Sequence, residues 1–275
     1  MKKSITAYPY IVWMIIFIVV PLLLVVFYSF TVPTDEGIKF SLENFKRFAE
    51  PLYIKVLIRS IFLALISTLI CLIVGYPVAM ILASKEVSNR NIMVFLFVLP
   101  MWMNFLLRTY AWLTLLERNG IINMFLTNLG LPRLDMLYND KAVILGMVYN
   151  FLPFMVLPIY TVITKIDKSI IEAAQDLGGN ALTVFKKIIF PLSLPGVISG
   201  ITMVFMPAIT TFVISRLLGG GQYTLIGNLI EQQFLSVGDW NFGSAISIIM
   251  MLIILISMGF MTRYEKENEG GGGLW

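Results

Sequence analysis

Six apolar stretches, each long enough to cross a lipid bilayer, constrain this chain more than any other feature of its sequence. A transmembrane helix needs about 20 consecutive, mainly apolar residues. Runs of that kind lie at 9–30, 57–83, 92–115, 142–163, 192–217 and 243–261. The sequence therefore predicts an all-α, polytopic membrane protein with six transmembrane helices, and an even number of spans places both termini on one side of the membrane.

The composition agrees with a membrane protein that has no soluble domain. Hydrophobic residues make up 58% of the chain and charged residues only 13%, whereas roughly 25% of the residues in soluble domains are charged. Six spans fill most of the 275 residues and leave hardly any room for an ATP-binding domain, so we expect any energy source on a partner. The formal charge of +4 is explained by basic residues that flank the spans, and we expect no nucleic-acid partner.

The residue types present exclude most catalytic chemistry. The chain has one cysteine, Cys71, and no histidine, so it cannot form a disulfide, a Cys/His metal site or a Cys-His nucleophile within itself. We expect no metal site, no cofactor and no enzymatic activity in this chain. Because no Asp or Glu lies deep in a span, a proton relay is also unexpected, which argues against a proton-coupled secondary carrier.

Basic residues are denser in the loops on one side of the predicted spans, and this asymmetry predicts the orientation. About ten Lys and Arg occur in about fifty residues on that side, against about six in about seventy-five on the other, and the basic side is cytoplasmic. We expect a cytoplasmic N-terminus, a six-helix transmembrane domain and a flexible tail at 1–8, 9–263 and 264–275.

Ser199, Thr202, Met206 and Thr210 share one face of the fifth predicted span. A small, partly polar stripe of this kind lines a transport pathway or packs against another helix, and spacing alone leaves both open. Prolines interrupt the neighbouring segments and indicate broken helices around a cavity, or plain structural kinks. These prolines are Pro100, Pro153, Pro158, Pro191, Pro195 and Pro207.

Few other side chains in the spans invite a specific role. Arg59 and Arg108 lie near the outer membrane boundary, where we expect their guanidinium groups to reach the interface or to line an outer gate. Aromatic residues also gather near that side, and they favour either a cation-π path for a cationic substrate or an interfacial belt. They are Trp102, Tyr110, Trp112 and Trp240.

The polar segment between the fourth and fifth spans, residues 165–191, is called here the coupling loop. Ser169 and Glu172 have the spacing of a capping box and predict the start of a short helix. Gly178 and Gly179 predict a left-handed turn that ends it, and Asn180 predicts the cap of a second helix that runs to Phe190, where Pro191 closes it. An ordinary amphipathic hairpin at the membrane surface has the same pattern.

The coupling loop resembles the EAA motif of ABC-importer permeases. Glu172, Ala173 and Ala174 are followed at the spacing of that motif by Gly178, Ile188 and the pair Phe190-Pro191. Phenylalanine replaces the usual leucine. The resemblance implies a type I ABC importer permease (MetI-like) fold, in which Glu172, Ala173, Ala174 and Gly178 dock on a cytoplasmic ABC ATPase.

Other stretches resemble the polyamine permeases of this family, including "LPMWMNFLLRTYAW" and "RLLGGGQYTLIGNLIEQQF". The resemblance implies import of spermidine or putrescine with a second permease subunit and an extracytoplasmic polyamine-binding protein, in a bacterial inner membrane. The sequence departs from the family at Arg216, where other members carry an acidic residue that would suit a cation pathway. Import of an anion or an iron complex, or a secondary carrier, are the alternatives.

Overall fold

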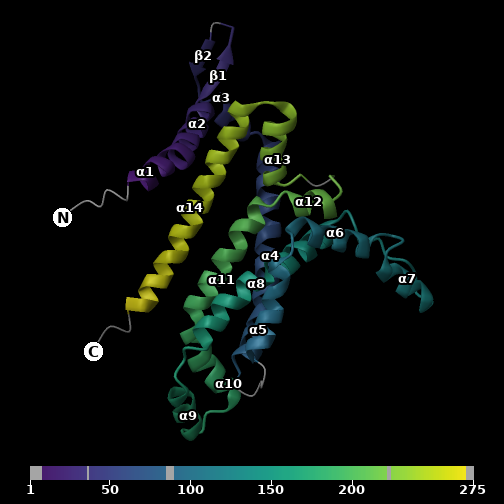
Figure 1. Ribbon diagram of the computed structural model, residues 1–275, viewed down its shortest axis with the longest axis vertical. Helices are drawn as coiled ribbons and strands as arrows, with labels where there is room; N and C mark the ends of the chain where they lie inside the picture. The colour runs from purple at the N-terminus through teal and green to yellow at the C-terminus, as the bar shows by residue number, and fades with distance from the viewer. Residues whose placement is uncertain (1–7, 36, 85–89, 222–223, 271–275) are drawn as a thin grey trace, which may run out of the picture.

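The computed structural model is mainly helical and describes residues 8–35, 37–84, 90–221 and 224–270 (Figure 1). Five of its helices are long and apolar enough to cross a membrane, and one bent pair supplies a sixth span. The spans are Tyr8–Ser29, Pro51–Ala83, Ile92–Trp102 with Phe105–Asn128, Asp140–Ile163, Ala181–Thr210 and Trp240–Phe260. Their order confirms the six-span prediction.

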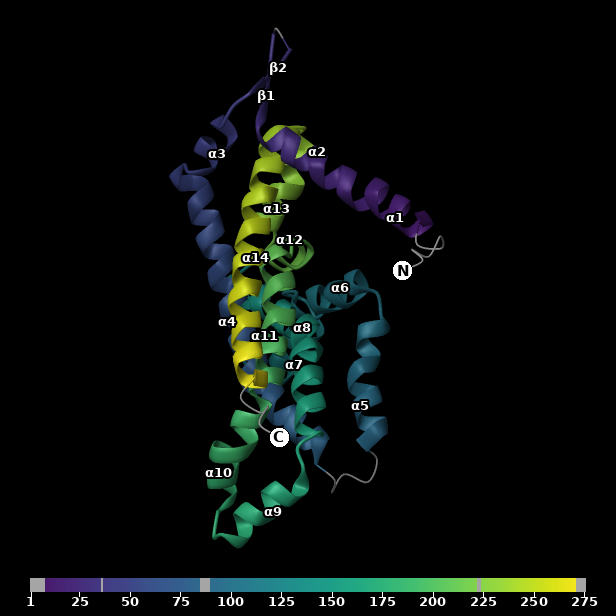
Figure 2. The ribbon, with the colours of Figure 1, turned by 90° about the vertical axis from the view of Figure 1, so that its left-hand side faces the viewer.

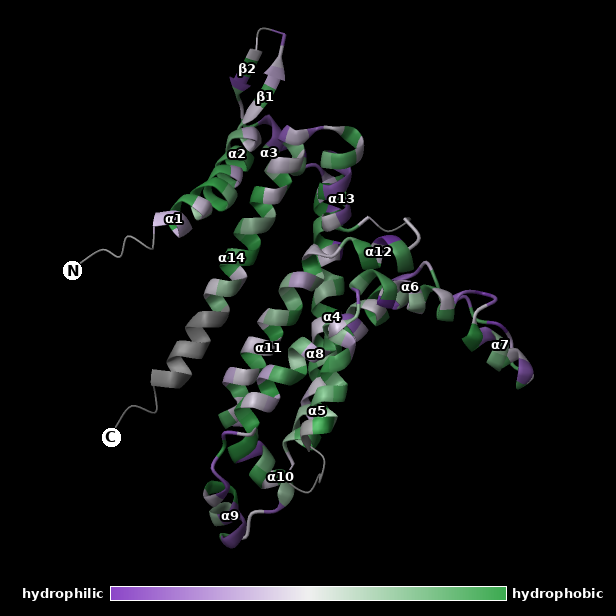
Figure 3. Cartoon of the chain, in the orientation of Figure 1, coloured by the Kyte–Doolittle hydropathy of each residue, from purple (hydrophilic) through white to green (hydrophobic). Residues whose placement is uncertain are grey.

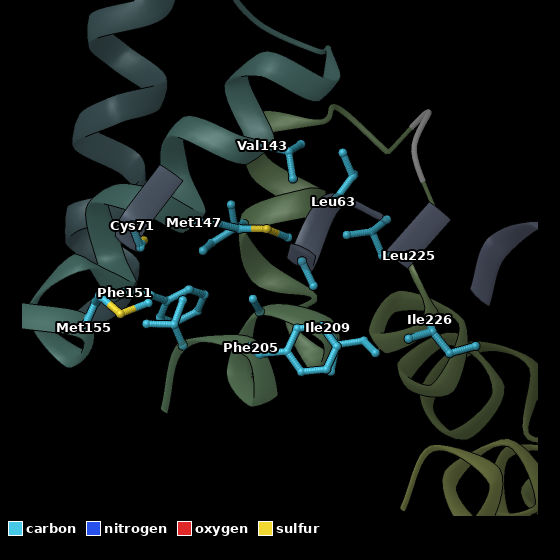
Figure 4. Packing of buried hydrophobic residues seen from close by; sticks show 14 of the residues in the cluster. Leu63, Cys71, Val143, Met147, Phe151, Met155, Phe205, Ile209, Leu225 and Ile226 are labelled. Carbon is cyan, nitrogen blue, oxygen red and sulfur yellow. The ribbon is translucent and has the colours of Figure 1, made fainter. Parts of the chain in front are cut away.

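Three helices form the centre of the bundle: α4 (Pro51–Ala83), α8 (Asp140–Ile163) and α11 (Phe190–Thr210). Residues four apart on α8 point along one face into the core between α4 and α11 (Figure 4). The buried side chains there include Leu63, Cys71, Val143, Met147, Phe151, Met155, Phe205 and Ile209. The core is apolar and rich in sulfur.

Two glycines let α11 approach α8 closely. A Cβ atom on Gly196 would lie 2.9 Å from the carbonyl oxygen of Pro158, and one on Gly200 would lie 2.8 Å from Met155 Sδ. Small residues four apart are the usual means of close helix packing in membranes, where lipid is as apolar as the side chains. The side of α11 that carries these glycines is therefore its packing face.

The first span contains α1 (Tyr8–Met14), the π-helical turn η2 (Ile15–Val19) and α2 (Val20–Ser29). It leads into an antiparallel hairpin, β1 (Thr31–Thr34) and β2 (Gly37–Phe40), and then α3 (Glu43–Phe48). Most of its apolar side chains are exposed in this single chain. α2 packs against α14 (Trp240–Gly270), so the contact of this span with the bundle is made near the end that leads into the hairpin.

Polar side chains at α3 and the start of α14 fix the hairpin end of the first span. The Asn44 side-chain amide donates to the carbonyl oxygen of Thr31 at 3.0 Å, and the Asn241 amide donates to the same oxygen at 2.8 Å. Arg47 pairs with Asp239 at 2.8 Å and lies 4.0 Å above the Phe242 ring. The hairpin and the starts of the second and last spans are thereby tied together.

The third span bends by 91° and does not cross as one straight helix. α5 (Arg90–Val98) and the 3-10 turn η3 (Leu99–Trp102), which contains Pro100, are followed by α6 (Phe105–Leu116) and α7 (Ile121–Asn128). The Asn104 side chain caps α6, because its oxygen accepts from the backbone N–H of Leu106 at 2.8 Å. The fifth span also ends earlier than predicted, at Thr210, and is followed by α12 (Val213–Leu218), α13 (Ile226–Gln232) and η5 (Gln233–Val237).

At the ends of the chain, α14 runs to Gly270, into the segment expected to be a flexible tail. The predicted N-terminal segment 1–8 lies outside the described residues except for Tyr8, and so do residues 271–275 of the tail.

Candidate functional site

The coupling loop lies at the opposite end of the bundle from the β1–β2 hairpin in both views (Figures 1 and 2). Its first helix is α9 (Lys168–Asp176). The cap is Asp167, whose carboxylate accepts from the backbone N–H of Ser169 at 3.0 Å, so the predicted capping box of Ser169 with Glu172 is wrong. Hydrogen bonds from the Ser169 backbone and hydroxyl lower the pKa of Asp167 below its ordinary value, because they stabilise the charged carboxylate.

The turn after α9 confirms the predicted glycine elbow. Gly178 has φ +83°, in the left-handed region. Its N–H donates to the carbonyl of Gln175 and the N–H of Gly179 donates to that of Ala174, both at 2.9 Å. This is the Schellman arrangement, which pairs the last carbonyls of a helix.

The second helix of the loop begins as predicted but does not end where predicted. The Asn180 side chain accepts from the backbone N–H of Thr183 at 2.9 Å and caps α10 (Ala181–Val184). The chain then passes through the π-helical turn η4 (Phe185–Ile189) directly into α11. The prediction that Pro191 closes this helix at the membrane is therefore wrong.

A π-helical turn explains how the helix continues through that proline. Pro191 cannot donate to the carbonyl four residues earlier, and in η4 the N–H of Phe190 instead donates to the carbonyl of Phe185, five residues back. A π-helical turn also precedes Pro21 in the first span, where the N–H of Val20 donates to the carbonyl of Ile15, five residues back. Residues 181–210 thus form one continuous helix of 30 residues.

The predicted docking residues lie on the outer surface of the loop. Glu172, Ala173 and Gly178 are exposed and Ala174 is half-buried. Apolar side chains accompany them, because Leu177 is 90% exposed and Leu182 is 60% exposed. Hydrophilic residues appear on α9 and its connections, as they do at the opposite end of the molecule, whereas the middle of the bundle is mostly apolar (Figure 3). Exposed apolar side chains on a polar loop are typical of a surface that another protein covers.

The inner side of the loop borders a cavity of about 560 Å³. The cavity lies between α9 and the inner ends of α4 and α8, and its lining includes Met80, Ala83, Ile163, Asp167, Ile171 and Ile189. This cavity therefore leaves space between part of α9 and the bundle.

The predicted pathway residues lie on α11 beside its glycine packing face. Ser199, Thr202 and Met206 are half-buried and Thr210 is exposed. The Thr202 hydroxyl donates to the carbonyl of Ile198 at 2.9 Å, and that of Thr210 donates to Met206 at 3.1 Å. Hydroxyls bonded to their own helix are compatible with a cavity or with lipid or protein contact, so the pathway role stays a prediction.

The break after Thr210 is held by side chains that the sequence did not single out. The Asn228 amide donates to the carbonyl of Phe212 at 2.8 Å, and its oxygen accepts from the Ser215 hydroxyl and from the backbone N–H of Leu225. Ser60 of α4 accepts from the backbone N–H of Ile226 at 2.8 Å. The sequence marks this break only by Asn228, an asparagine near the start of a helix inside an apolar loop.

The arginines differ from one another in their surroundings. Arg59 pairs with Asp140 at 2.6 Å. Arg216, the residue that departs from the family pattern, pairs with Glu231 at 2.6 Å. The carboxylate of Glu231 therefore balances the positive charge of Arg216. The expectation that Arg108 reaches the interface is wrong, because Arg108 is only 8% exposed and its Nε has no hydrogen-bond partner among the described residues.

The aromatic residues of the outer side stack on separate neighbours. Trp102 contacts Phe95 with ring centroids 5.7 Å apart, and Trp240 contacts Phe234 at 5.6 Å. Trp112 contacts Tyr149 at 5.3 Å and brings α6 onto α8. Trp102, Tyr110 and Trp240 are exposed in this single chain, and their place on a cation path stays a prediction.

Comparison with known proteins extends this description. The spermidine/putrescine transport system permease protein PotB of Escherichia coli (strain K12) is 41% identical over 247 residues, which cover 88% of this chain and 90% of that protein. PotB of Haemophilus influenzae is 39% identical over 261 residues, covering 92% of this chain and 91% of that protein. The sequence resemblance to polyamine permeases is thereby confirmed.

Solved structures show the same fold at low sequence identity. A chain of a bacterial ABC transporter involved in the import of the acidic polysaccharide alginate superposes with a TM-score of 0.80 and 17% identity, covering 94% of this chain and 93% of that chain. A chain of the MetNI methionine ABC transporter in an inward-facing conformation gives a TM-score of 0.58 and 14% identity, covering 80% of this chain and 99% of that chain. These likenesses confirm the MetI-like fold.

The family described as binding-protein-dependent transport system inner membrane component matches residues 72–268, which include the coupling loop and the last four spans. This chain therefore belongs to that family of inner membrane transport components.

Proposed function

We propose that this chain is the transmembrane permease subunit of an ABC importer for polyamines, spermidine and putrescine, driven by ATP that a partner subunit hydrolyses. The substrate is supported by the similarity to the spermidine/putrescine permease PotB, to which about nine tenths of the chain can be aligned. The transport role is supported by membership of the family of binding-protein-dependent inner membrane components. The chain itself supplies the path and the coupling element.

One observation carries the mechanism. The second helix of the coupling loop and the predicted pathway face belong to the same continuous helix, Ala181–Thr210. A cytoplasmic ATPase that docks on Glu172, Ala173, Ala174 and Gly178 would move that helix at its inner end. Ser199, Thr202, Met206 and Thr210 would then move with it, which is how ATP-driven closure would switch the cavity from inside to outside.

The partners follow from this arrangement. A cavity on one face of α11 needs a second permease subunit to close it. A substrate must be delivered on the opposite side from the ATPase, and one structurally similar alginate transporter was solved with a substrate-bound periplasmic protein. We assign the coupling loop and both termini to the cytoplasm, and the β1–β2 hairpin to the outer side of a bacterial inner membrane.

The ion pair of Arg216 removes one argument for an anionic substrate. Arg216 stands where other family members carry an acidic residue. Its positive charge would favour an anionic substrate if no carboxylate paired with it. Its guanidinium instead pairs with Glu231, whose side chain is only 13% exposed. The local net charge is therefore close to zero, and a cationic substrate is not repelled there.

Uptake by the complete complex tests the proposal. Vesicles that contain this chain, a second permease and the ATPase should accumulate labelled spermidine when binding protein is outside and ATP inside. Unlabelled putrescine should compete, whereas phosphate and sulfate should not. Accumulation without ATP, or competition by phosphate or sulfate, would contradict the proposed function.

A further inference from the structure

The fifth span is most easily bent where it enters the membrane. Pro191 and Pro195 have no N–H for the carbonyls four residues earlier, and η4 replaces the regular bonds of one turn with a wider π-helical pattern. Residues 185–195 form this hinge. Unless another part of the protein holds the hinge rigid, a movement of the coupling loop would bend the helix there and would not reach the rest of the span.

Tyr76 of α4 contacts the hinge at both ends of the π-helical turn. Its ring lies 5.7 Å from the ring of Phe185 and 5.9 Å from that of Phe190, and these two rings are 6.1 Å apart. Phe185 begins η4 and Phe190 directly follows it. One aromatic side chain from another helix therefore packs across the whole turn.

The Tyr76 hydroxyl makes a third contact beyond the turn. It lies 2.7 Å from the hydroxyl oxygen of Ser193, and both side chains are buried. Ser193 donates its proton to the carbonyl of Phe190 at 2.9 Å. Tyr76 must therefore be the donor to Ser193, since the serine proton is already used. In a medium of low polarity this chain of hydrogen bonds fixes the side chains relative to the helix.

We infer that Tyr76 is a positioning residue for coupling: it holds the hinge rigid, so that movement of the coupling loop passes Pro191 and reaches the face with Ser199, Thr202, Met206 and Thr210. This inference rests on the proposed function. The cavity beside α9 leaves space for the coupling loop to move. Immediately above the loop, Tyr76 joins the continuous helix Ala181–Thr210 to α4.

The test removes the Tyr76 hydroxyl and measures the ratio of spermidine uptake to ATP hydrolysis. Tyr76→Phe keeps the three rings and deletes the hydrogen bond. Spermidine uptake and ATP hydrolysis are measured on the same vesicles with the complete complex. The uptake per ATP should fall about fivefold, the factor that a hydrogen bond of about 1 kcal/mol represents in an equilibrium, while ATP hydrolysis persists. A merely structural role would lower both activities together and leave the ratio unchanged.

Companion variants identify the bond as the cause. Ser193→Ala should lower the same ratio, and the double variant should lower it no further, because both changes remove one interaction. Ser193→Thr keeps a hydroxyl and should restore the ratio. Ser67→Ala is the control, because Ser67 is also buried on α4 but its hydroxyl contacts Met147 Sδ, at 3.3 Å, in α8; its ratio should equal that of the wild type.

A wild-type ratio for Tyr76→Phe would overturn the inference, and so would an equal fall for Ser67→Ala. If the wild-type complex hydrolyses ATP but does not import spermidine, the proposed substrate fails instead. The readout is then the stimulation of ATP hydrolysis by loaded binding protein, which Tyr76→Phe should reduce and Ser67→Ala should leave intact. Unchanged stimulation in Tyr76→Phe would again overturn the inference.

Discussion

At the scale of single residues, the two adjacent glycines of the coupling loop are needed for different reasons. Gly178 has open space around its missing side chain, but its φ of +83° disfavours any residue with a Cβ atom. Gly179 has an ordinary φ, but a Cβ atom there would lie 2.6 Å from the carbonyl oxygen of Ala174. The first glycine permits the turn and the second permits the hydrogen bond that closes it.

Replacement of Gly178 by valine should therefore uncouple the transporter without preventing its insertion. A β-branched residue in the left-handed region costs about 2 kcal/mol or more, enough to displace α10 relative to α9. We expect loss of uptake and weaker co-purification with the ATPase. Gly130→Val is the matched control, because Gly130 has φ +75° and open space, but lies in a different loop. Normal uptake and co-purification in Gly178→Val would refute a docking role for the elbow.

Among the predicted docking residues, Glu172 is the one for which the structure removes an alternative role, that of a helix cap. Asp167 caps α9, so Glu172 is not required for the start of the helix, and its carboxylate is exposed. Glu172→Gln should leave the helix intact and reduce transport about tenfold, which is the effect expected when one charge-assisted contact of about 1.5 kcal/mol is lost. Uptake and ATPase binding are compared with Glu43→Gln, a similarly exposed glutamate in the first turn of α3. Wild-type uptake by Glu172→Gln would exclude a charged contact with the ATPase.

At the scale of elements, the spans were predictable but their interruptions were not. Apolar run length identified all six, since a bilayer sets that length. A proline such as Pro191 ends a helix in water, but here a π-helical turn pairs the affected backbone, and sequence gives no sign of that choice. Likewise Asp167 and Ser169 are both good caps two residues apart, and the packing of the loop decides between them.

The ion pair of Arg216 and Glu231 joins α12 to α13, and a charge exchange tests its role. Arg216→Glu places two carboxylates together and should lower the melting temperature by about 2 to 4 °C, as expected for a partly exposed pair worth up to about 1 kcal/mol. Glu231→Arg should cost more, because that side chain is only 13% exposed. The double exchange should recover most of the loss.

The control for this exchange is Arg133→Glu, which changes the charge equally at an exposed arginine whose hydrogen bond is to the neutral Asn119. Thermal unfolding of the purified complex measures each effect. A double variant that is less stable than either single variant would show that the pair is not a mutual contact.

At the scale of the whole molecule, the hinge and the predicted pathway face follow one another along one helix, Ala181–Thr210, and the predicted docking residues lie directly before it, on α9 and the glycine turn. The coupling loop is at its inner end, the contact with Tyr76 follows, and Thr210 marks its outer end, where Asn228 holds the break. α8 packs on the adjacent side of α11, which carries Gly196 and Gly200. An input at the loop therefore has a short mechanical route along this helix to the middle of the membrane.

Cysteine accessibility along α11 tests whether that route ends at a pathway. In a Cys71→Ala background, cysteines at Ser199, Thr202, Met206 and Thr210 should react with a small, water-soluble thiol reagent. Their reactivity should change when ATP and loaded binding protein are added, because alternating access opens the middle of the membrane to one side at a time. Val204→Cys is the control: Val204 lies on the same helix but is fully buried, so it should stay unreactive in every state. If all four positions behave like Val204 with and without ATP, this face packs against protein or lipid, and the substrate must pass along another helix.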